Sequence, residues 1–195
     1  MRHNQGSGKT ALAVHWAHRM APHFPDGQLF VNLRGYDERD PMQPIDALAS
    51  LLRSMDVPPE SVPHDLDEAS AMFRRLLTDR RMLFLLDNAG SWELVRPLLP
   101  ADAGTLVLVT SRDRLVTAPE GFQPITLAQL STVDALELVS HIVGAPRVAA
   151  EPDSAALLAR VCGHLPLALR IAAANLADQA GRSITDFVAG GSGHR

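Results

Sequence analysis

The chain has 195 residues, of which 46% are hydrophobic and 21% charged, and its formal net charge is −4. This length suits one domain and part of a second, and the composition is ordinary for a globular protein and excludes a disordered chain. Its apolar runs are too short for a membrane-spanning helix of ~20 residues, and its charge provides no basic excess for nucleic acid. The single cysteine, Cys162, excludes a disulfide framework and a multi-cysteine zinc site, and with the lack of an apolar leader it indicates the reducing cytoplasm.

The first predicted element is a loop that binds phosphate. Gly6–Thr10 reads Gly-Ser-Gly-Lys-Thr and runs into a predicted helix over 11–17. Such a turn directs backbone N–H groups at one point, where Lys9 would reach the β- and γ-phosphates of a nucleotide and the Thr10 hydroxyl would ligate Mg²⁺. Lys9 is the only lysine among 18 basic residues, which favours a specific role for its compact ammonium group. The full pattern has a glycine where this chain has His3, so the loop needs support from the rest of the sequence.

Strands and helices then alternate along the chain. We predict a strand over 28–33 and amphipathic helices over 44–55 and 67–77, the second of them capped by Asp65 or Asp67. This alternation is typical of an α/β protein, in which a mostly parallel sheet carries helices on its faces.

A charged residue follows each of the next two predicted strands. The apolar run Met82–Leu86 ends at Asp87, and the β-branched run over 105–110 is followed by Arg112. Continuous apolar runs are typical of strands buried on both faces, and the carboxyl ends of parallel strands form one ligand-binding edge. Asp87 there would hold Mg²⁺ through its water shell, and Arg112 would contact the γ-phosphate. The alternatives are an ordinary Asp-Asn turn and a solvated arginine.

Only helices are predicted beyond about residue 130. A short helix over 91–96 and a last strand over 123–127 complete the strand-containing part. A capping box at Ser131–Asp134 then opens a series of helices, expected over 135–143, 155–162, 165–177 and 183–188. We therefore expect three parts: a nucleotide-binding domain over 1–129, a helical subdomain over 130–189 and a flexible tail over 190–195.

Five motifs in this order carry a family resemblance. They are Gly6–Ala13, Leu29–Asp37, Leu83–Ala89, Leu108–Arg112 and Cys162–Leu169. Together they resemble the NB-ARC module of the STAND class of P-loop NTPases, in the version found in actinobacterial transcription regulators of the antibiotic regulatory (SARP) type. The resemblance extends from residue 6 to about 180 and implies a mostly parallel P-loop NTPase sheet followed by a small helical ARC-type subdomain.

The resemblance also implies a role for individual residues. Lys9 and Thr10 resemble the Walker A pair, Asp87 the Walker B acid and Arg112 the sensor arginine. Pro166 matches a proline near the nucleotide base, although it is also an ordinary first residue of a helix. The implied cofactors are ADP or ATP and Mg²⁺, with Thr10 and Asp87 on the metal. The implied nucleotide-binding residues are Gly6, Ser7, Gly8, Lys9, Thr10, Ala11, Arg112 and Pro166.

Several departures from the family pattern affect these expectations. Family members have a strand before the phosphate loop, and this sequence lacks it. His3 and Gln5 occupy two positions where the family's phosphate loop has glycine. That strand would lie between the last two strands of the sheet, which would lose backbone partners without it. We expect that the chain begins inside a domain, that it stops before the family's winged-helix subdomain, and that a phosphate site persists at lower affinity.

Asn88 stands where fast ATPases of this group carry a catalytic glutamate. Asparagine cannot act as a base, and the nearby Glu93 is equally explained as part of a helix start, so we expect slow ATP hydrolysis or none. Three hypotheses remain: an ADP- or ATP-binding switch module of a signal-transduction or transcription regulator, an active ATPase or phosphotransferase, and a remnant that acts only in protein contacts. The first, which we favour, implies protein partners or self-assembly, no direct nucleic-acid binding by this segment and no membrane.

Overall fold

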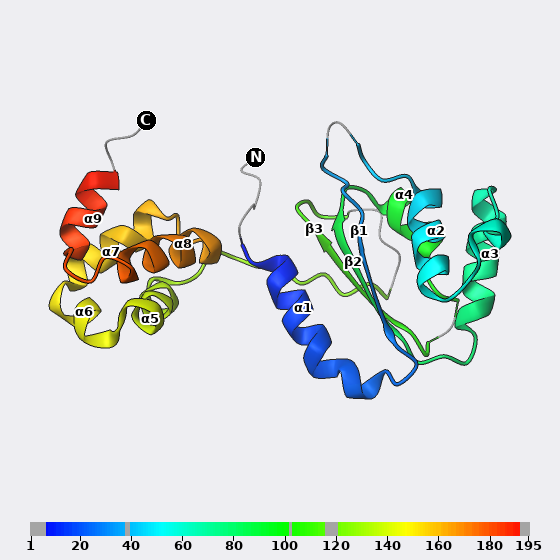
Figure 1. Cartoon of the computed structure of the whole chain (residues 1–195), viewed down its shortest axis with the longest axis horizontal. Coiled ribbons are helices and arrows are strands. Elements are labelled where there is room, and N and C mark those ends of the chain that lie inside the picture. The colour runs from blue at the N-terminus through cyan, green and yellow to red at the C-terminus, as the bar shows by residue number, and fades with distance from the viewer. Residues whose placement is uncertain (1–6, 38–39, 102, 116–120, 192–195) are drawn as a thin grey trace. The chain divides into compact units, whose positions relative to one another are not determined.

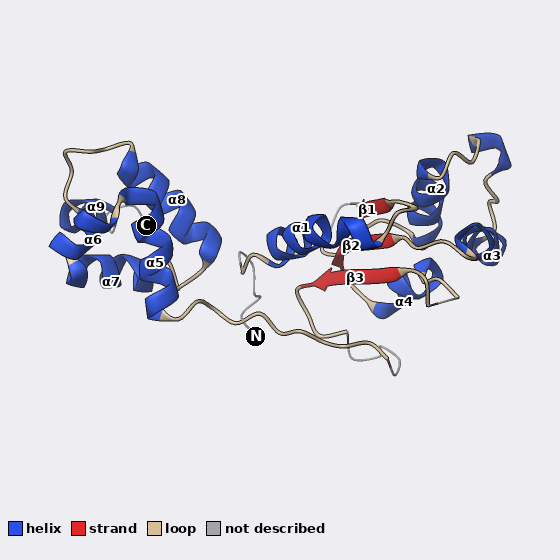
Figure 2. Ribbon diagram, turned by 90° about the horizontal axis from the view of Figure 1, so that it is seen from below, coloured by secondary structure: helices blue, strands red, loops and turns tan. Residues whose placement is uncertain are grey.

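The computed structural model describes residues 7–37, 40–101, 103–115 and 121–191, which form two compact units. The first unit contains Lys9–Pro124, and the second contains the residues from Ile125 onward together with Ser7 and Gly8. Among the described residues, strands occur only in the first unit, and the regular elements of the second are all helices (Figure 2).

A three-stranded parallel sheet forms the centre of the first unit (Figure 1). Its strands, in spatial order, are β1 (Gln28–Asn32), β2 (Leu83–Ala89) and β3 (Leu106–Ser111). The central strand β2 is almost fully buried, as its unbroken apolar sequence predicts. Because all three strands run the same way, their carboxyl ends meet at one edge of the sheet. The expected α/β class, with a parallel sheet and flanking helices, is confirmed.

The main hydrophobic core lies between one face of the sheet and three helices, α2 (Pro44–Ser54), α3 (Leu66–Leu77) and α4 (Trp92–Val95). Side chains alternate between the faces of a strand, so Phe84 and Leu86 of β2 enter this core. The Phe84 ring stacks on Phe73 of α3, with ring centroids 5.5 Å apart. Asp65 accepts hydrogen bonds from two backbone N–H groups of the first turn of α3, which decides between the two predicted caps.

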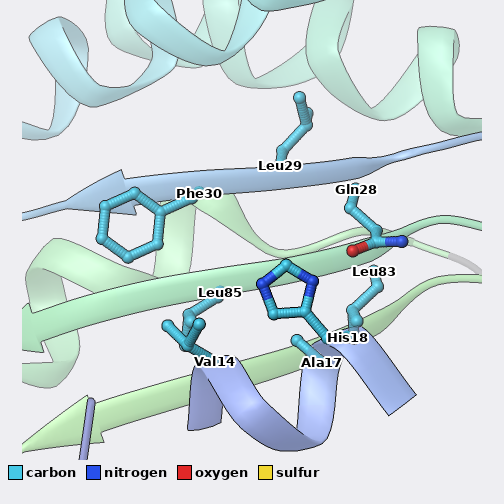
Figure 3. A pocket seen from close by; sticks show the side chains of 8 residues that line it. All are labelled: Val14, Ala17, His18, Gln28, Leu29, Phe30, Leu83 and Leu85. Carbon is cyan, nitrogen blue, oxygen red and sulfur yellow. The ribbon is translucent and has the colours of Figure 1, made fainter. Parts of the chain in front are cut away.

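Helix α1 (Lys9–Met20) covers the opposite face of the sheet (Figure 1). None of its residues is fully buried, and Phe30 of β1 remains 55% exposed. A hollow of about 350 Å³ lies between α1 and the first two strands (Figure 3), and its lining is mostly apolar: Val14, Ala17, His18, Gln28, Leu29, Phe30, Leu83 and Leu85. This face is therefore covered less completely than the face that carries the core.

The predicted strand over 123–127 is wrong. These residues have no regular secondary structure, and the side chain of Ile125 is 83% exposed. A strand needs a neighbour for its backbone hydrogen bonds, and in the part of the chain that the structure describes β3 pairs only with β2. Apolar content alone therefore did not make this segment a strand.

Five helices form the second unit, as far as it is described. The predicted ones are α5 (Thr132–Val143), α7 (Pro152–Val161), α8 (Pro166–Ala177) and α9 (Ile184–Gly191). Ser131 is confirmed as the N-cap of α5, because its hydroxyl accepts a hydrogen bond from the Asp134 N–H. The Asp134 carboxylate accepts from the Ser131 hydroxyl, so only this half of the predicted capping box is seen. The sequence did not predict the short helix α6 (Ala145–Ala150), and α9 includes Gly190 and Gly191, which we expected in the tail.

Two charged side chains of the α6–α7 region hold the end of the second unit in place. The Arg147 guanidinium donates hydrogen bonds to the carbonyl oxygens of Leu176, in the last turn of α8, and of Gln179 and Arg182, which follow that helix. The Glu151 carboxylate accepts hydrogen bonds from the first backbone N–H groups of α9 and from the Thr185 hydroxyl. These hydrogen bonds lower the pKa of Glu151 below its ordinary value of 4.5, and the bond from the Thr185 hydroxyl has the largest effect.

We expect Glu151→Gln to lower the melting temperature of the protein at neutral pH, because an amide has one acceptor oxygen for three donors. The folded pKa lies below the unfolded one, so the stability from Glu151 is present above about pH 4.5 and is lost as the pH falls through the folded pKa. Thermal unfolding followed by circular dichroism measures this, and the difference between variant and wild type should shrink in acid. Glu137→Gln, at an exposed glutamate of α5, is the control; equal losses from both variants would contradict the prediction.

Candidate functional site

The buried carboxylate of Asp87 stands at the carboxyl end of β2. It is only 6% exposed and is the one buried acidic residue in the described part of the chain. Its Oδ1 atom accepts hydrogen bonds from the hydroxyls of Thr110, at 2.5 Å, and Thr10, at 2.8 Å. A buried carboxylate without partners is costly, so these two donors fix its position. The bond from Thr10 joins the start of α1 to the end of β2 across 77 residues of sequence.

A local irregularity of β2 directs this carboxylate. The register with β3 shifts between Leu86 and Ala89, and Asn88 within this stretch has a positive φ of 60°. Asparagine tolerates this left-handed conformation better than most residues, which explains its place beside the acid. The Asn88 N–H donates to the Thr110 hydroxyl at 3.0 Å, so Thr110 bridges the backbone of the shifted strand and the Asp87 carboxylate.

Lys9 and Arg112 bring positive charge to the same edge of the sheet. Lys9 is the first residue of α1, where the helix dipole is positive. Partial burial lowers the pKa of Lys9 below its ordinary value of 10.5, the positive charge of Arg112 lowers it further, and the negative charge of Asp87 opposes both. Thr10, the neighbour of Lys9, and Thr110, two residues before Arg112, both donate to the Asp87 carboxylate, so the three charged residues lie at the same edge of the sheet. Two cations against one carboxylate leave a net positive charge, which suits an anionic ligand.

Arg112 is held by an aromatic ring. Its guanidinium carbon lies over the ring of Tyr36, 4.8 Å from the centroid. Among the described residues no carboxylate forms an ion pair with it. Its charge therefore remains available to a ligand.

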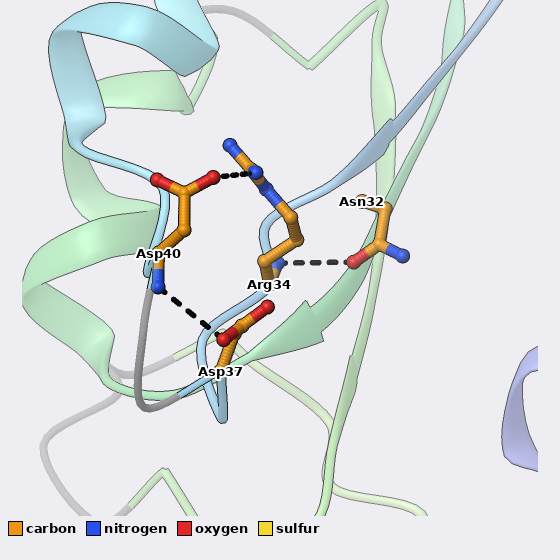
Figure 4. Close-up of polar contacts among 4 residues, drawn as sticks. All are labelled: Asn32, Arg34, Asp37 and Asp40. Carbon is orange, nitrogen blue, oxygen red and sulfur yellow. Dashed lines mark hydrogen bonds and ion pairs between the residues drawn. The ribbon is translucent and has the colours of Figure 1, made fainter.

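Polar contacts connect the end of β1 with described residues of the loop that follows it, which carries Tyr36 (Figure 4). Asn32 Oδ1 accepts a hydrogen bond from the Arg34 N–H at 3.0 Å, and Arg34 forms an ion pair with Asp40. The Asp40 N–H donates to Asp37 Oδ1 at 3.3 Å. Two of these contacts link described residues on the two sides of positions 38–39.

Sequence reasoning missed two residues of this edge, Thr110 and Tyr36. Thr110 occupies the polar end of a strand next to Asp87, a position that could have drawn attention to it. Tyr36 is the only tyrosine of the chain and lies between glycine and aspartate, but nothing in that pattern predicts a contact with a residue 76 positions away.

The remaining predicted site residues fall in different places. Gly6 lies outside the described residues, and Ala11 is exposed on the first turn of α1. In the second unit, Ser7 is buried and Gly8 has a positive φ of 81°, which favours glycine. Pro166 is the first residue of α8, and a Cβ atom placed on Gly8 would lie 3.9 Å from its ring. The structure thus brings together Lys9, Thr10, Asp87 and Arg112 in the first unit, and Gly8 and Pro166 in the second.

Comparison with known proteins identifies the family. The model of the NB-ARC domain matches residues 4–149, about three quarters of the chain. The chain belongs to the NB-ARC family. NB-ARC is a nucleotide-binding domain, so this chain is a nucleotide-binding module, and the expected family is confirmed.

Individual relatives of the chain come from bacteria and plants. The chain is 47% identical over 172 residues to the regulatory protein AfsR of Streptomyces griseus and 46% identical over 172 residues to that of Streptomyces coelicolor. These matches cover 88% of the chain but only 18% and 17% of the two relatives. The probable disease resistance protein RF45 of Arabidopsis thaliana is 32% identical over 117 residues, 54% of the chain and 12% of that protein. The chain therefore spans less than a fifth of the curated relatives it matches.

Two further findings limit the kinds of site that the described NB-ARC residues contain. No helix among them has the length and apolar character needed to cross a membrane. In the same residues, no group of three or more histidine, cysteine, aspartate or glutamate side chains could hold a metal ion. The described residues therefore contain no cluster of this kind. The metal site that the sequence motifs predict is of another kind and combines the Asp87 carboxylate with the Thr10 hydroxyl.

We expect Thr110→Val to destabilise the protein by about 1.5–3 kcal/mol, because it removes a hydrogen bond to a buried charge and leaves the Asn88 N–H without its acceptor. Thr10→Val should cost less than about 1 kcal/mol, since Thr10 is exposed and water can replace its hydroxyl. Urea unfolding at neutral pH measures both changes. Equal losses would contradict the assignment of Thr110 as the main support of the Asp87 carboxylate.

Proposed function

We propose that the chain binds ADP or ATP with Mg²⁺ and acts as a regulatory switch module. The observation that supports this most strongly is the Thr10–Asp87 hydrogen bond, which joins the phosphate-loop motif to the acid that ends β2. The net positive charge from Lys9 and Arg112 at the same edge is complementary to a polyphosphate. The NB-ARC family supplies the ligand class.

The phosphates would lie at the start of α1. Lys9 would contact the β- and γ-phosphates, and backbone N–H groups from Gly6 to Ala11 would surround them, as glycine-rich loops before helices do. The left-handed Gly8 supports this role, because a residue with a side chain would be strained there. Pro166 would contact the nucleotide base, as the family resemblance implies.

Mg²⁺ would be held by Thr10 and Asp87. Mg²⁺ prefers hard oxygen ligands and keeps several of its waters, and these two side chains present a hydroxyl and a carboxylate 2.8 Å apart. The donor set therefore fits the metal. When bound, Mg²⁺ would neutralise phosphate charge, while Asp87 keeps the Thr10 side chain at the loop.

ATP hydrolysis by this chain would be slow or absent. Asn88 follows Asp87 and cannot take a proton from an attacking water. Glu93 is a poor substitute, since hydrogen bonds from its own backbone N–H and from Ser91 lower its pKa below the ordinary 4.5, which weakens it as a base. A bound nucleotide would then persist long enough to define a state of the module.

The switching role rests on the relatives. Two of them are named regulatory proteins, and this chain matches less than a fifth of each. Together with what the family resemblance implies, this leads us to propose a cytoplasmic regulator in which the exchange of ADP for ATP controls contacts with protein partners or with further copies. Direct nucleic-acid binding by this segment is not part of the proposal, because its net charge of −4 provides no basic excess.

The nucleotide proposal predicts that Mg·ADP raises the melting temperature of the 195-residue chain. Binding to the folded state alone contributes about 2.7 kcal/mol at a ligand concentration of 100 times Kd. Lys9→Ala should remove this stabilisation, because it removes the ammonium that contacts the phosphates. Differential scanning fluorimetry with increasing Mg·ADP measures both effects.

A matched control is Arg19→Ala, which removes an exposed cation from the last turn of the same helix. This variant should respond to Mg·ADP as the wild type does. A wild-type melting temperature that Mg·ADP leaves unchanged, or an equal response from Lys9→Ala, would refute nucleotide binding at this loop. Phosphate release from Mg·ATP in the same samples should stay at the blank rate; turnover that Asp87→Asn abolishes would instead support the active ATPase.

A further inference from the structure

The hydroxyl of Tyr36 ties together residues from the ends of β2 and β3. Its oxygen accepts hydrogen bonds from the backbone N–H groups of Arg112, at 3.0 Å, and Asp113, at 2.9 Å. It also lies 2.7 Å from Ser111 Oγ. Because the two N–H donors occupy the acceptor positions of the Tyr36 oxygen, its own hydrogen goes to Ser111, whose hydroxyl donates onward to the Ala89 carbonyl at 2.7 Å. The direction of this chain of hydrogen bonds is thus fixed.

The backbone before Tyr36 packs closely against the loop that follows β2. Gly35 donates its N–H to the Asn88 carbonyl at 2.9 Å, and a Cβ atom added to Gly35 would overlap the backbone of Gly90. A Cβ atom added to Gly90 would in turn overlap the Gly35 carbonyl. The loops that follow β1 and β2 therefore touch backbone to backbone immediately before Tyr36.

The same tyrosine holds both ends of Arg112. Its hydroxyl binds the Arg112 N–H, and its ring lies beneath the Arg112 guanidinium. In the described part of the chain no carboxylate competes for that guanidinium. A long arginine side chain has many rotamers, and the ring restricts them to those that keep the cation near Lys9 and Asp87.

We propose that Tyr36 is a positioning residue that holds Arg112 ready for the γ-phosphate and so sets how strongly the chain prefers ATP to ADP. This inference rests on the proposed nucleotide site and extends it to a residue outside the phosphate-loop motif. Tyr36 itself touches no phosphate in this scheme. Its effect on affinity must pass through Arg112, which separates it from a residue that merely supports the fold.

The test is a double-mutant cycle on the full chain with Mg·ADP and with a non-hydrolysable Mg·ATP analogue. Isothermal titration calorimetry gives Kd for the wild type, Tyr36→Leu, Arg112→Gln and the double variant. Tyr36→Leu should weaken the binding of the ATP analogue about tenfold, the size of one charge-assisted hydrogen bond, and that of ADP less than about twofold. In the Arg112→Gln background, Tyr36→Leu should change neither affinity by more than about twofold.

Two further variants keep the test decisive if Tyr36→Leu folds poorly. Tyr36→Phe retains the ring beneath the guanidinium and loses the hydroxyl, and it should lose a smaller part of the ATP preference. Phe122→Leu is the matched control, because it removes an aromatic ring of the same unit that packs on Trp92, with centroids 4.9 Å apart. It should leave the ratio of the two affinities unchanged.

The possible failures are distinguishable. If the wild type binds neither nucleotide, the proposed function fails and the role of Tyr36 fails with it. If the wild type binds both but the Tyr36 variants weaken ADP and the ATP analogue equally, Tyr36 only supports the fold. If the loss in Tyr36→Leu persists in full in the Arg112→Gln background, Tyr36 does not act through Arg112, and the inference is overturned.

Discussion

The first unit is organised around a carboxylate that is buried at the end of its central strand. A buried carboxylate requires donors, and the hydroxyls of Thr10 and Thr110, which carry no charge, both donate to Asp87. These donors stabilise the carboxylate without neutralising it, so the negative charge persists among positive groups. Hydroxyl partners also fix the start of α1 and the end of β3 relative to β2, which an exposed ion pair would do less strictly.

The parallel sheet brings these side chains together, because the carboxyl ends of all three strands lie at one edge. The loop after β1 supplies Tyr36, the end of β2 supplies Asp87, and the end of β3 supplies both Thr110 and Arg112. The buried carboxylate of Asp87 accepts two hydroxyl donors from within the protein. The cation of Arg112 instead lies on an aromatic ring and keeps its charge for a ligand. This asymmetry is what suits the edge to anions.

Much of this edge could be read from the sequence because it depends on local patterns. The apolar run before Asp87 and the glycine-rich turn before α1 are each a continuous stretch of sequence. The parallel fold then brings Asp87 and the start of α1 together. Tyr36 could not be found in this way, since its contact with Arg112 depends on the course of a loop and on two glycines that meet across it. The strand expected over 123–127 failed for a related reason: pairing is a property of two segments, and the apolar pattern of one did not reveal that a partner was lacking. The short helix α6, which follows Gly144, was also missed, because a stretch of six residues offers too little periodicity to detect.

The direct test of the central claim uses the single lysine of the chain as a reporter. In protein labelled only with ¹³C-lysine, Lys9 is the one labelled side chain. If its ammonium shares a metal-phosphate site with Thr10 and Asp87, paramagnetic Mn²⁺ with ADP should broaden the Lys9 side-chain signals, excess Mg²⁺ should restore them, and Asp87→Asn should weaken the effect. Lys9 signals that stay sharp while Mn·ADP binds would show that the lysine and the metal occupy different places, which would contradict the account.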